Sequence, residues 1–232
     1  MSEKLDWGRS MFNLFGKNDT KLQADVVEEL KWDPSVTACD IITTANRGII
    51  TLRGVVPHFL EKKMAEAAAQ RVGGVRAIVD EIEVSLPDLS QREDEKIAEA
   101  ALMALKWNSQ IPQGINVVVN NAWVTLSGEA SWEYERCAAK RAVSELMGVR
   151  GVTNNITIRS QELSTDLRTL IGQALARSAV REGRKIEVDV DGGHVSLSGS
   201  VNSYSERSVA ETAAWRAPGV TSVTNTLMIT HS

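Results

Sequence analysis

The sequence predicts an α+β protein of three tandem α-β-β-α-β domains, each with a three-stranded mixed sheet and two helices on one face. The first observation behind this prediction is a strand-ending motif, Thr/Ser-Leu-x-Gly, found at 51–54, 125–128 and 196–199. The second is a Gly-Val pair that begins 20 residues after each of these glycines, at Gly74, Gly148 and Gly219. Both the motif and the Gly-Val pair lie 74 residues further along in the second copy than in the first, and 71 residues further along in the third than in the second. A repeat of that length can enclose its own core.

Each repeat is expected to begin with an amphipathic helix. Its apolar residues recur at spacing i, i+4, i+8, which places them on one helix face. Asn18 and Ser164 are start signals in the first and third repeats, and Ser90 with Glu93 predicts a capping box in the second. The predicted inward positions are Leu22, Val26 and Leu30, then Ile97, Ala101 and Leu105, then Leu167, Ile171 and Leu175.

Two strands joined by a tight hairpin follow the first helix. In the third repeat Ile186, Val188 and Val190 alternate with charged residues, and this period of two predicts one buried and one wet face. Asn, Asp and Gly tolerate the positive φ that tight hairpins need. The predicted turns are Asn46-Arg47-Gly48, Asn120-Asn121 and Asp191-Gly192.

An alanine-rich second helix and a closing strand complete each repeat. The closing strand starts at the Gly-Val pair and should run parallel to its neighbour after a right-handed crossover. The predicted limits are an aromatic and apolar N-terminal segment at 1–18 and domains at 19–87, 88–160 and 161–232.

Composition narrows the range of functions. The net charge is −4, and no repeat is basic overall, which argues against a nucleic-acid partner. Cys39 and Cys137 occupy non-equivalent positions in their repeats, so they are expected to be free thiols. The sequence has neither an apolar run of membrane-spanning length nor a recognisable export signal. These features predict a cytoplasmic protein, with peripheral attachment at the inner membrane as an extension.

The repeated motifs resemble those of the BON domain family. The resemblance rests on the Leu-x-Gly strand end, on a Glu-Lys or Glu-Arg pair after it, and on a closing Gly-Val-x-x-Val-x-Asn segment. The segments at 148–154 and 219–225 fit this pattern, whereas the first repeat has Ile78 and Asp80 in the last two pattern positions. The charged pairs are Glu61-Lys62, Glu135-Arg136 and Glu206-Arg207.

The resemblance implies a non-enzymatic binding module without a cofactor, acting at membranes and phospholipids under osmotic or envelope stress. The expected partner is therefore anionic phospholipid or an envelope-associated protein. One branch of the family senses potassium, which makes a cytoplasmic sensor of a monovalent cation or small ligand the first alternative. A structural protein–protein adaptor is the second alternative.

The residues themselves give no support for catalysis or for a metal site. His58, His194 and His231 fall at unrelated places, and neither cysteine has a recurring histidine partner. The segment 189–192 has two of the acidic ligands of a calcium loop but lacks the others, so a hairpin turn is the simpler interpretation.

A basic cluster in the third repeat is the predicted phospholipid site. Arginine-rich helix ends can bind phosphate oxygens in bidentate fashion, although basic residues also stabilise a helix C-terminus without a ligand. The cluster consists of Arg168, Arg177, Arg181, Arg184 and Lys185.

Exposed apolar residues are the predicted membrane or interdomain contacts. Trp7, Phe12 and Phe15 lie in the N-terminal segment, which could dock on domain 1 or insert into a membrane surface. Ile49 and Trp123 are repeat-equivalent and fall on the sheet faces away from the helices. We expect these faces to be covered by each other, by the N-terminal segment or by a second chain through oligomerisation.

Two further repeated features are expected to be structural. Trp32 and Trp107 end the first helices of their repeats and are interpreted as edges of the core. The Glu-Lys and Glu-Arg pairs are interpreted as a solvated face of the second helix, with Glu favoured by the helix dipole.

Overall fold

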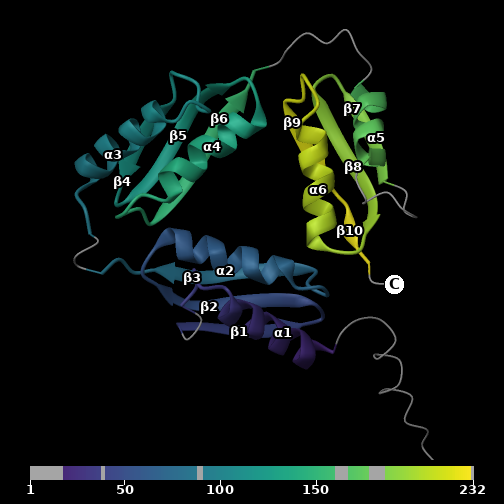
Figure 1. Ribbon diagram of the computed structural model, residues 1–232, viewed down its shortest axis with the longest axis horizontal. Helices are drawn as coiled ribbons and strands as arrows, with labels where there is room; N and C mark the ends of the chain where they lie inside the picture. The colour runs from purple at the N-terminus through teal and green to yellow at the C-terminus, as the bar shows by residue number, and fades with distance from the viewer. Residues whose placement is uncertain (1–17, 38–39, 88–90, 160–166, 178–185, 231–232) are drawn as a thin grey trace, which may run out of the picture.

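The computed structural model describes residues 18–37, 40–87, 91–159, 167–177 and 186–230. The predicted order of elements occurs three times in them (Figure 1). Domain 1 contains α1 (Asp19–Trp32), β1 (Ile41–Asn46), β2 (Ile49–Val56), α2 (Phe59–Arg71) and β3 (Ala77–Val84). Domain 2 contains α3 (Asp94–Trp107), β4 (Asn116–Asn120), β5 (Trp123–Ala130), α4 (Glu133–Ser144) and β6 (Gly151–Ile158). Domain 3 contains α5 (Leu167–Arg177), β7 (Ile186–Asp191), β8 (His194–Val201), α6 (Tyr204–Trp215), β9 (Ser222–Asn225) and β10 (Met228–Ile229).

Each sheet has its second strand in the centre. The first strand is antiparallel to it, and the closing strand is parallel to it, as predicted. In domain 3 the closing strand is divided into β9 and β10, which both pair with β8. Two helices lie on one face of each sheet, which confirms the predicted fold class (Figure 1).

The first helices bury the residues that their periodicity predicts. All nine predicted inward side chains are buried, and each set belongs to the core of its own domain. The Asn18 side chain accepts a hydrogen bond from the Thr20 amide and caps α1. The predicted capping box of the second repeat is wrong, because α3 begins only after Glu93, which itself stands at the N-cap.

The hairpin turns use the predicted backbone conformations. Arg47, Asn121 and Gly192 all have positive φ. The first residue of the preceding helix holds two of the turns: the Asp19 carboxylate accepts from the amides of residues 47 and 48, and Asp94 does the same at 121 and 122. A helix start and a hairpin are thus joined by one aspartate in each of the first two domains.

Thr43 is a polar side chain inside the core of domain 1. It is 4% exposed, and its hydroxyl oxygen has no hydrogen-bond partner among the described residues. The strand register places Thr43 opposite Leu52, where domains 2 and 3 have Val117 and Val188 opposite their leucines.

We therefore expect Thr43→Val to stabilise domain 1. Removing a buried hydroxyl without a partner recovers its desolvation cost, about 1 kcal/mol, while side-chain volume hardly changes. The shift in the urea or thermal unfolding of domain 1 measures this gain. The control is Thr44→Val, one residue along on the exposed face of the same strand, which should not increase the stability of domain 1. A destabilised Thr43→Val protein would contradict the prediction.

The second helices take part in the contacts between the three domains. Figure 1 shows α2, α4 and α6 on the sides of their domains that face the middle of the molecule. Phe59 at the start of α2 is part of the core cluster of domain 2. Tyr204 at the start of α6 packs against the clusters of domains 1 and 3. The Arg136 guanidinium lies 5.1 Å from the centre of the Trp215 ring, which joins domain 2 to domain 3.

Candidate functional site

The predicted phosphate-binding cluster is only partly within the described residues. Arg181, Arg184 and Lys185 lie outside them. Arg168 forms an ion pair with Asp189, with 2.7 Å between the two charged groups. Arg177 is exposed at the other end of α5, nine residues after Arg168 and about 13 Å from it along the helix axis. The described part of the cluster therefore does not converge on one phosphate group.

Only some of the predicted apolar contact residues are among the described residues. Trp7, Phe12 and Phe15 lie outside the described residues. Ile49 and Trp123 lie on the open faces of two different sheets and are 42% and 49% exposed. Among the described residues nothing covers these faces, because Ile42 and Val118 beside them are more than half exposed as well. Within the described part of the chain, these two sheet faces therefore do not cover each other.

The residue that begins the central strand makes a cross-strand contact in the second and third sheets. The Trp123 ring lies over Gly151, where an added Cβ would come within 2.4 Å of the indole. Its Nε1 donates a hydrogen bond to Thr153 Oγ1 at 2.8 Å. In domain 3 the equivalent pair is His194 and Ser222, which are hydrogen-bonded to each other. The large Trp123 ring thus lies over a glycine, whereas the smaller His194 ring lies beside a serine. The space that the indole needs accounts for a glycine at position 151.

Trp32 and Trp107 are not core edges, contrary to the prediction. They are 84% and 83% exposed, and each stands at the C-terminal end of the first helix of its domain. Lys31 and Lys106 precede them, and neither lysine has an ion-pair partner in the described part of the chain. We call the four residues Lys31, Trp32, Lys106 and Trp107 the lysine–tryptophan ends.

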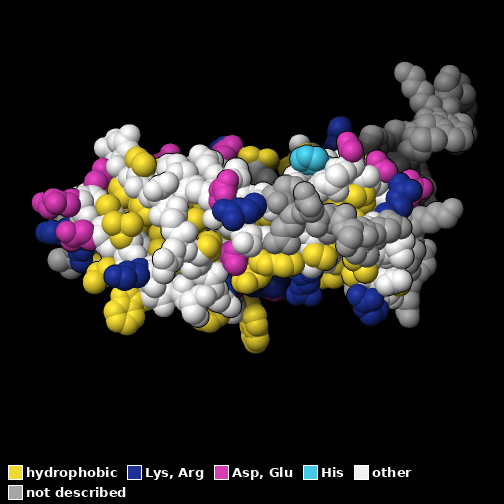
Figure 2. Space-filling model, turned by 90° about the horizontal axis from the view of Figure 1, so that it is seen from above, with side chains coloured by type: hydrophobic (Ala, Val, Ile, Leu, Met, Phe, Trp, Pro, Cys, Tyr) yellow, Lys and Arg dark blue, Asp and Glu magenta, His cyan; other side chains and the backbone are white. Residues whose placement is uncertain are grey.

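The surroundings of these ends add apolar surface and charge. Leu102 and Met103, one turn before Trp107, are both more than half exposed. Figure 2 shows hydrophobic side chains that project clear of one edge of the molecule, with Lys and Arg side chains nearby. In domain 3 the position of the tryptophan is taken by Arg177, so the three equivalent helix ends carry two indoles and one guanidinium.

An ionic network holds the chain directly after Trp32. Arg71 at the end of α2 contacts the Glu29 and Asp33 carboxylates, each at 2.7 Å. The Asp33 carboxylate also accepts from the Ser35 hydroxyl and amide. Hydrogen bonds from Ser35 and Arg71 lower the pKa of Asp33 from 3.8 to about 2. This network fixes the end of α1 against α2.

We expect Asp33→Asn to lower the stability of domain 1 in a pH-dependent way. Because the pKa of Asp33 is lower in the folded than in the unfolded protein, its contribution is present above pH 3.8 and is lost as pH falls toward 2. The difference in unfolding free energy between wild type and variant should therefore shrink over that window. Glu28→Gln, an exposed carboxylate of the same helix, is the control. A difference that stays constant down to pH 2 would contradict this assignment.

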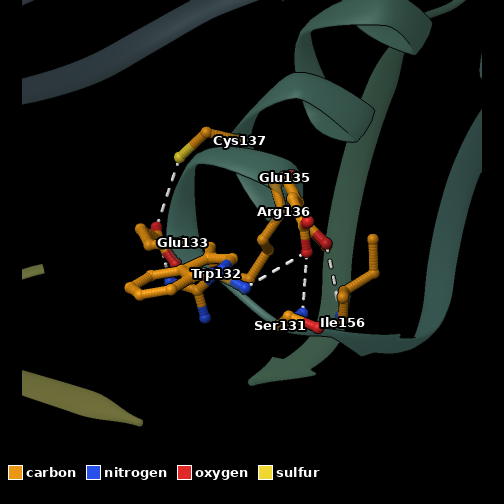
Figure 3. Close-up of polar contacts among 8 residues, drawn as sticks. Ser131, Trp132, Glu133, Glu135, Arg136, Cys137 and Ile156 are labelled. Atoms are coloured by element: carbon orange, nitrogen blue, oxygen red, sulfur yellow. Dashed lines mark hydrogen bonds and ion pairs between the residues drawn. The ribbon is translucent and has the colours of Figure 1, made fainter. Parts of the chain in front are cut away.

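The glutamate of each charged pair after the Leu-x-Gly motif binds backbone amides rather than facing solvent. Glu135 Oε2 accepts from the amides of Ser131 and Trp132 at 2.7 and 3.1 Å, as Figure 3 shows. Glu206 accepts from the Asn202 amide at 2.8 Å. Glu61 is only 8% exposed and accepts from the Thr37 amide. The interpretation as a solvated face is wrong for Glu61, and all three glutamates have a structural role.

The asparagine of the closing segment ties the last strand to the second helix. Asn154 Nδ2 donates to the Arg136 carbonyl at 2.9 Å, and Asn225 Nδ2 donates to the Arg207 carbonyl at 3.3 Å. In domain 1 the equivalent Asp80 cannot donate, and Lys62 forms an ion pair with it at 3.2 Å instead. The departure of the first repeat from the pattern thus exchanges an amide contact for an ionic one.

The described residues contain neither a candidate metal cluster nor a helix that could span a membrane. Across the described ranges, no group of three or more His, Cys, Asp or Glu side chains could hold a metal ion. None of the helices described is both long and apolar enough to cross a bilayer.

Comparison with known families agrees with the repeat geometry. The BON domain profile matches the chain three times, over residues 18–85, 93–160 and 164–230. The chain belongs to the BON domain family. Its three BON domains support a non-catalytic binding or adaptor role. A comparison with curated proteins finds no match.

Two solved structures from Chlamydia trachomatis are also similar to the chain. They are CdsD, a structural protein of the type III secretion system, and the C-terminal domain of CdsD. Each is 18% identical, with a TM-score of 0.26. The matches cover 91% and 92% of this chain, and 93% and 99% of the solved chains. At that TM-score the likeness carries no argument for the arrangement or role of the BON domains.

Proposed function

We propose that this protein is a non-catalytic binding protein that attaches peripherally to membranes rich in anionic phospholipid. The observation that carries the proposal is the exposure of Trp32 and Trp107 at equivalent helix ends, each directly after a lysine that forms no ion pair with a described residue. Indole rings favour the boundary between headgroups and acyl chains, and lysine favours an anionic surface.

The proposed binding surface is not the basic cluster of the third repeat that the sequence predicts. The lysine–tryptophan ends supply shallow insertion, and Arg177 adds attraction at the third helix end. The net charge of −4 means that attraction must be local, so binding should weaken steeply with salt. We place this attachment at the cytoplasmic side of the inner membrane and, by analogy with other BON proteins, in a response to osmotic or envelope stress.

Vesicle co-sedimentation tests the proposal with the full-length protein. We expect binding to vesicles of phosphatidylcholine with phosphatidylglycerol at low salt, and little binding to phosphatidylcholine alone. Arg177→Gln should reduce binding by about fivefold, since each basic residue near an anionic surface contributes about 1 kcal/mol. Absence of binding to the anionic vesicles at low salt would refute the proposal. Binding of equal strength to both kinds of vesicle would refute the role of anionic lipid.

The open sheet faces favour a second candidate, an adaptor for an envelope-associated protein. Apolar strips lie on two sheets and are 42–65% exposed; they consist of Ile42, Ile49, Val118 and Trp123. A protein partner would cover them without involving the lysine–tryptophan ends. Substituting Ile49 and Trp123 by serine would then abolish capture of the partner but leave vesicle binding unchanged.

A further inference from the structure

A groove of about 780 Å³ lies between α4 of domain 2 and α6 of domain 3. Its size is within the range of about 300–1,000 Å³ that is typical of small-molecule sites. Trp132, Tyr134 and Trp215 line it, so both domains contribute aromatic surface. Flat rings on two walls favour a ligand with a flat apolar body.

Trp215 is held in place from two sides. Its ring packs against the core of domain 3, and the Arg136 guanidinium covers it at 5.1 Å. Arg136 is held in turn by Glu133, with 2.6 Å between Nε and Oε2. Figure 3 shows Glu133 and Arg136 at the start of α4, with the Trp132 ring directed away from the sheet. The aromatic wall is therefore preorganised, which lowers the entropic cost of binding.

The net charge of the groove is positive, because two arginines stand against one unneutralised glutamate. Glu133 is paired with Arg136, whereas Glu211 accepts a hydrogen bond from the neutral Asn225 amide at 2.9 Å and keeps its negative charge. Arg141 and Arg216 also line the groove, are exposed, and form no ion pair with any described residue. Arg216 and Trp215 line the same groove, so a ligand bound there can meet both side chains. Arginine pairs strongly with planar anions such as carboxylates.

We infer that this groove binds a small aromatic anion. Its flat body lies against Trp132, Tyr134 and the surface of Trp215 that lines the groove, and its carboxylate or sulfonate pairs with Arg216, with Arg141 as the second cation of the site. This site is separate from the lysine–tryptophan ends, and the inference does not rest on membrane attachment.

Calorimetry with a charge series on one aromatic body tests the inference. The probes are naphthalene-2-carboxylate, the neutral 2-naphthalenemethanol and the cationic 2-naphthylmethylamine. We expect the carboxylate to bind about tenfold or more tightly than the other two, because only it carries a negative charge that can pair with arginine in bidentate fashion. No detectable binding of the carboxylate, or equal binding of all three probes, would overturn the inference.

Variants locate the site on the full-length protein. Arg216→Gln should weaken carboxylate binding by about tenfold, and Tyr134→Ser should weaken all three probes alike. Both side chains are exposed, so folding should be unaffected. Lys140→Gln, also exposed and next to Arg141 on α4 but outside the groove lining, is the matched control. Carboxylate binding that is unchanged in Arg216→Gln would overturn the assignment.

Cys137 provides a second readout inside the groove. Its thiol is exposed at the groove and donates a hydrogen bond to Glu133 Oε1 at 3.2 Å, and partial desolvation together with that contact raises the pKa of Cys137 to about 11. Alkylation should therefore be slow at neutral pH, because the thiolate is the reacting species. In a Cys39→Ser protein the carboxylate should slow alkylation of Cys137 further, and Arg216→Gln should remove that protection. An alkylation rate that saturating carboxylate leaves unchanged would place its binding elsewhere.

Discussion

Gly54→Ala is expected to unfold domain 1 in the otherwise intact protein. Gly54 ends the Leu-x-Gly motif, and a Cβ there would lie 2.0 Å from the Asp40 carbonyl oxygen. The contact is with backbone at the first pair of the β1–β2 ladder, Ile41 with Gly54, so no side-chain rotation relieves it. Overpacking and loss of the ladder end together should cost about 3 kcal/mol or more.

Hydrogen exchange measured by mass spectrometry gives the readout domain by domain. Peptides from β1 and β2 should lose protection, while peptides from domain 3 should keep it. Gly73→Ala is the matched control, because an added Cβ there meets nothing within 4 Å. Wild-type protection of β1 and β2 in Gly54→Ala would show that the strand end can move aside.

Trp32→Ser with Trp107→Ser is expected to abolish most vesicle binding. Both rings are exposed in the folded protein, so their apolar surface is free to be buried on binding to the vesicle. An indole that buries roughly 100 Å² of apolar surface there contributes about 2.5 kcal/mol to binding. Losing both should lower the partition coefficient at least about a hundredfold. Folding should be unaffected, since neither indole is part of a core cluster.

Tyr134→Ser is the control for the tryptophan pair. Tyr134 is an aromatic side chain that is 56% exposed, but it lines the groove between α4 and α6. Vesicle binding should stay at the wild-type level in this variant. If the double tryptophan variant still binds anionic vesicles fully, the lysine–tryptophan ends are not the membrane contact, and the proposed function loses its main support.

The repeated elements of the fold were predictable because they depend on local chemistry. The spacing of Leu22, Val26 and Leu30 predicted a buried helix face, and all three are at most 1% exposed. The turn residues predicted positive φ, which Asn121 and Gly192 adopt. The capping box at Ser90 and Glu93 was wrong, because short cap motifs match several starting points and tertiary packing selects one.

The candidate sites were less predictable. Trp32 and Trp107 have a spacing that is compatible with a core edge, yet both side chains are more than four-fifths exposed. A signal was available, since both follow lysine at the end of a helix and precede a polar residue. The groove between α4 and α6 gave no signal, because its residues come from two repeats and only domain packing brings them together.

The sequence by itself determined three BON domains, their order of elements and their cores, because periodicity, turns and glycines act within one repeat. The tertiary structure decided which apolar side chains stay in water and which pairs of helices form a groove. Those outcomes depend on contacts between residues far apart in the chain, such as Arg136 with Trp215 and Phe59 with the core of domain 2. No repeat taken alone contains them.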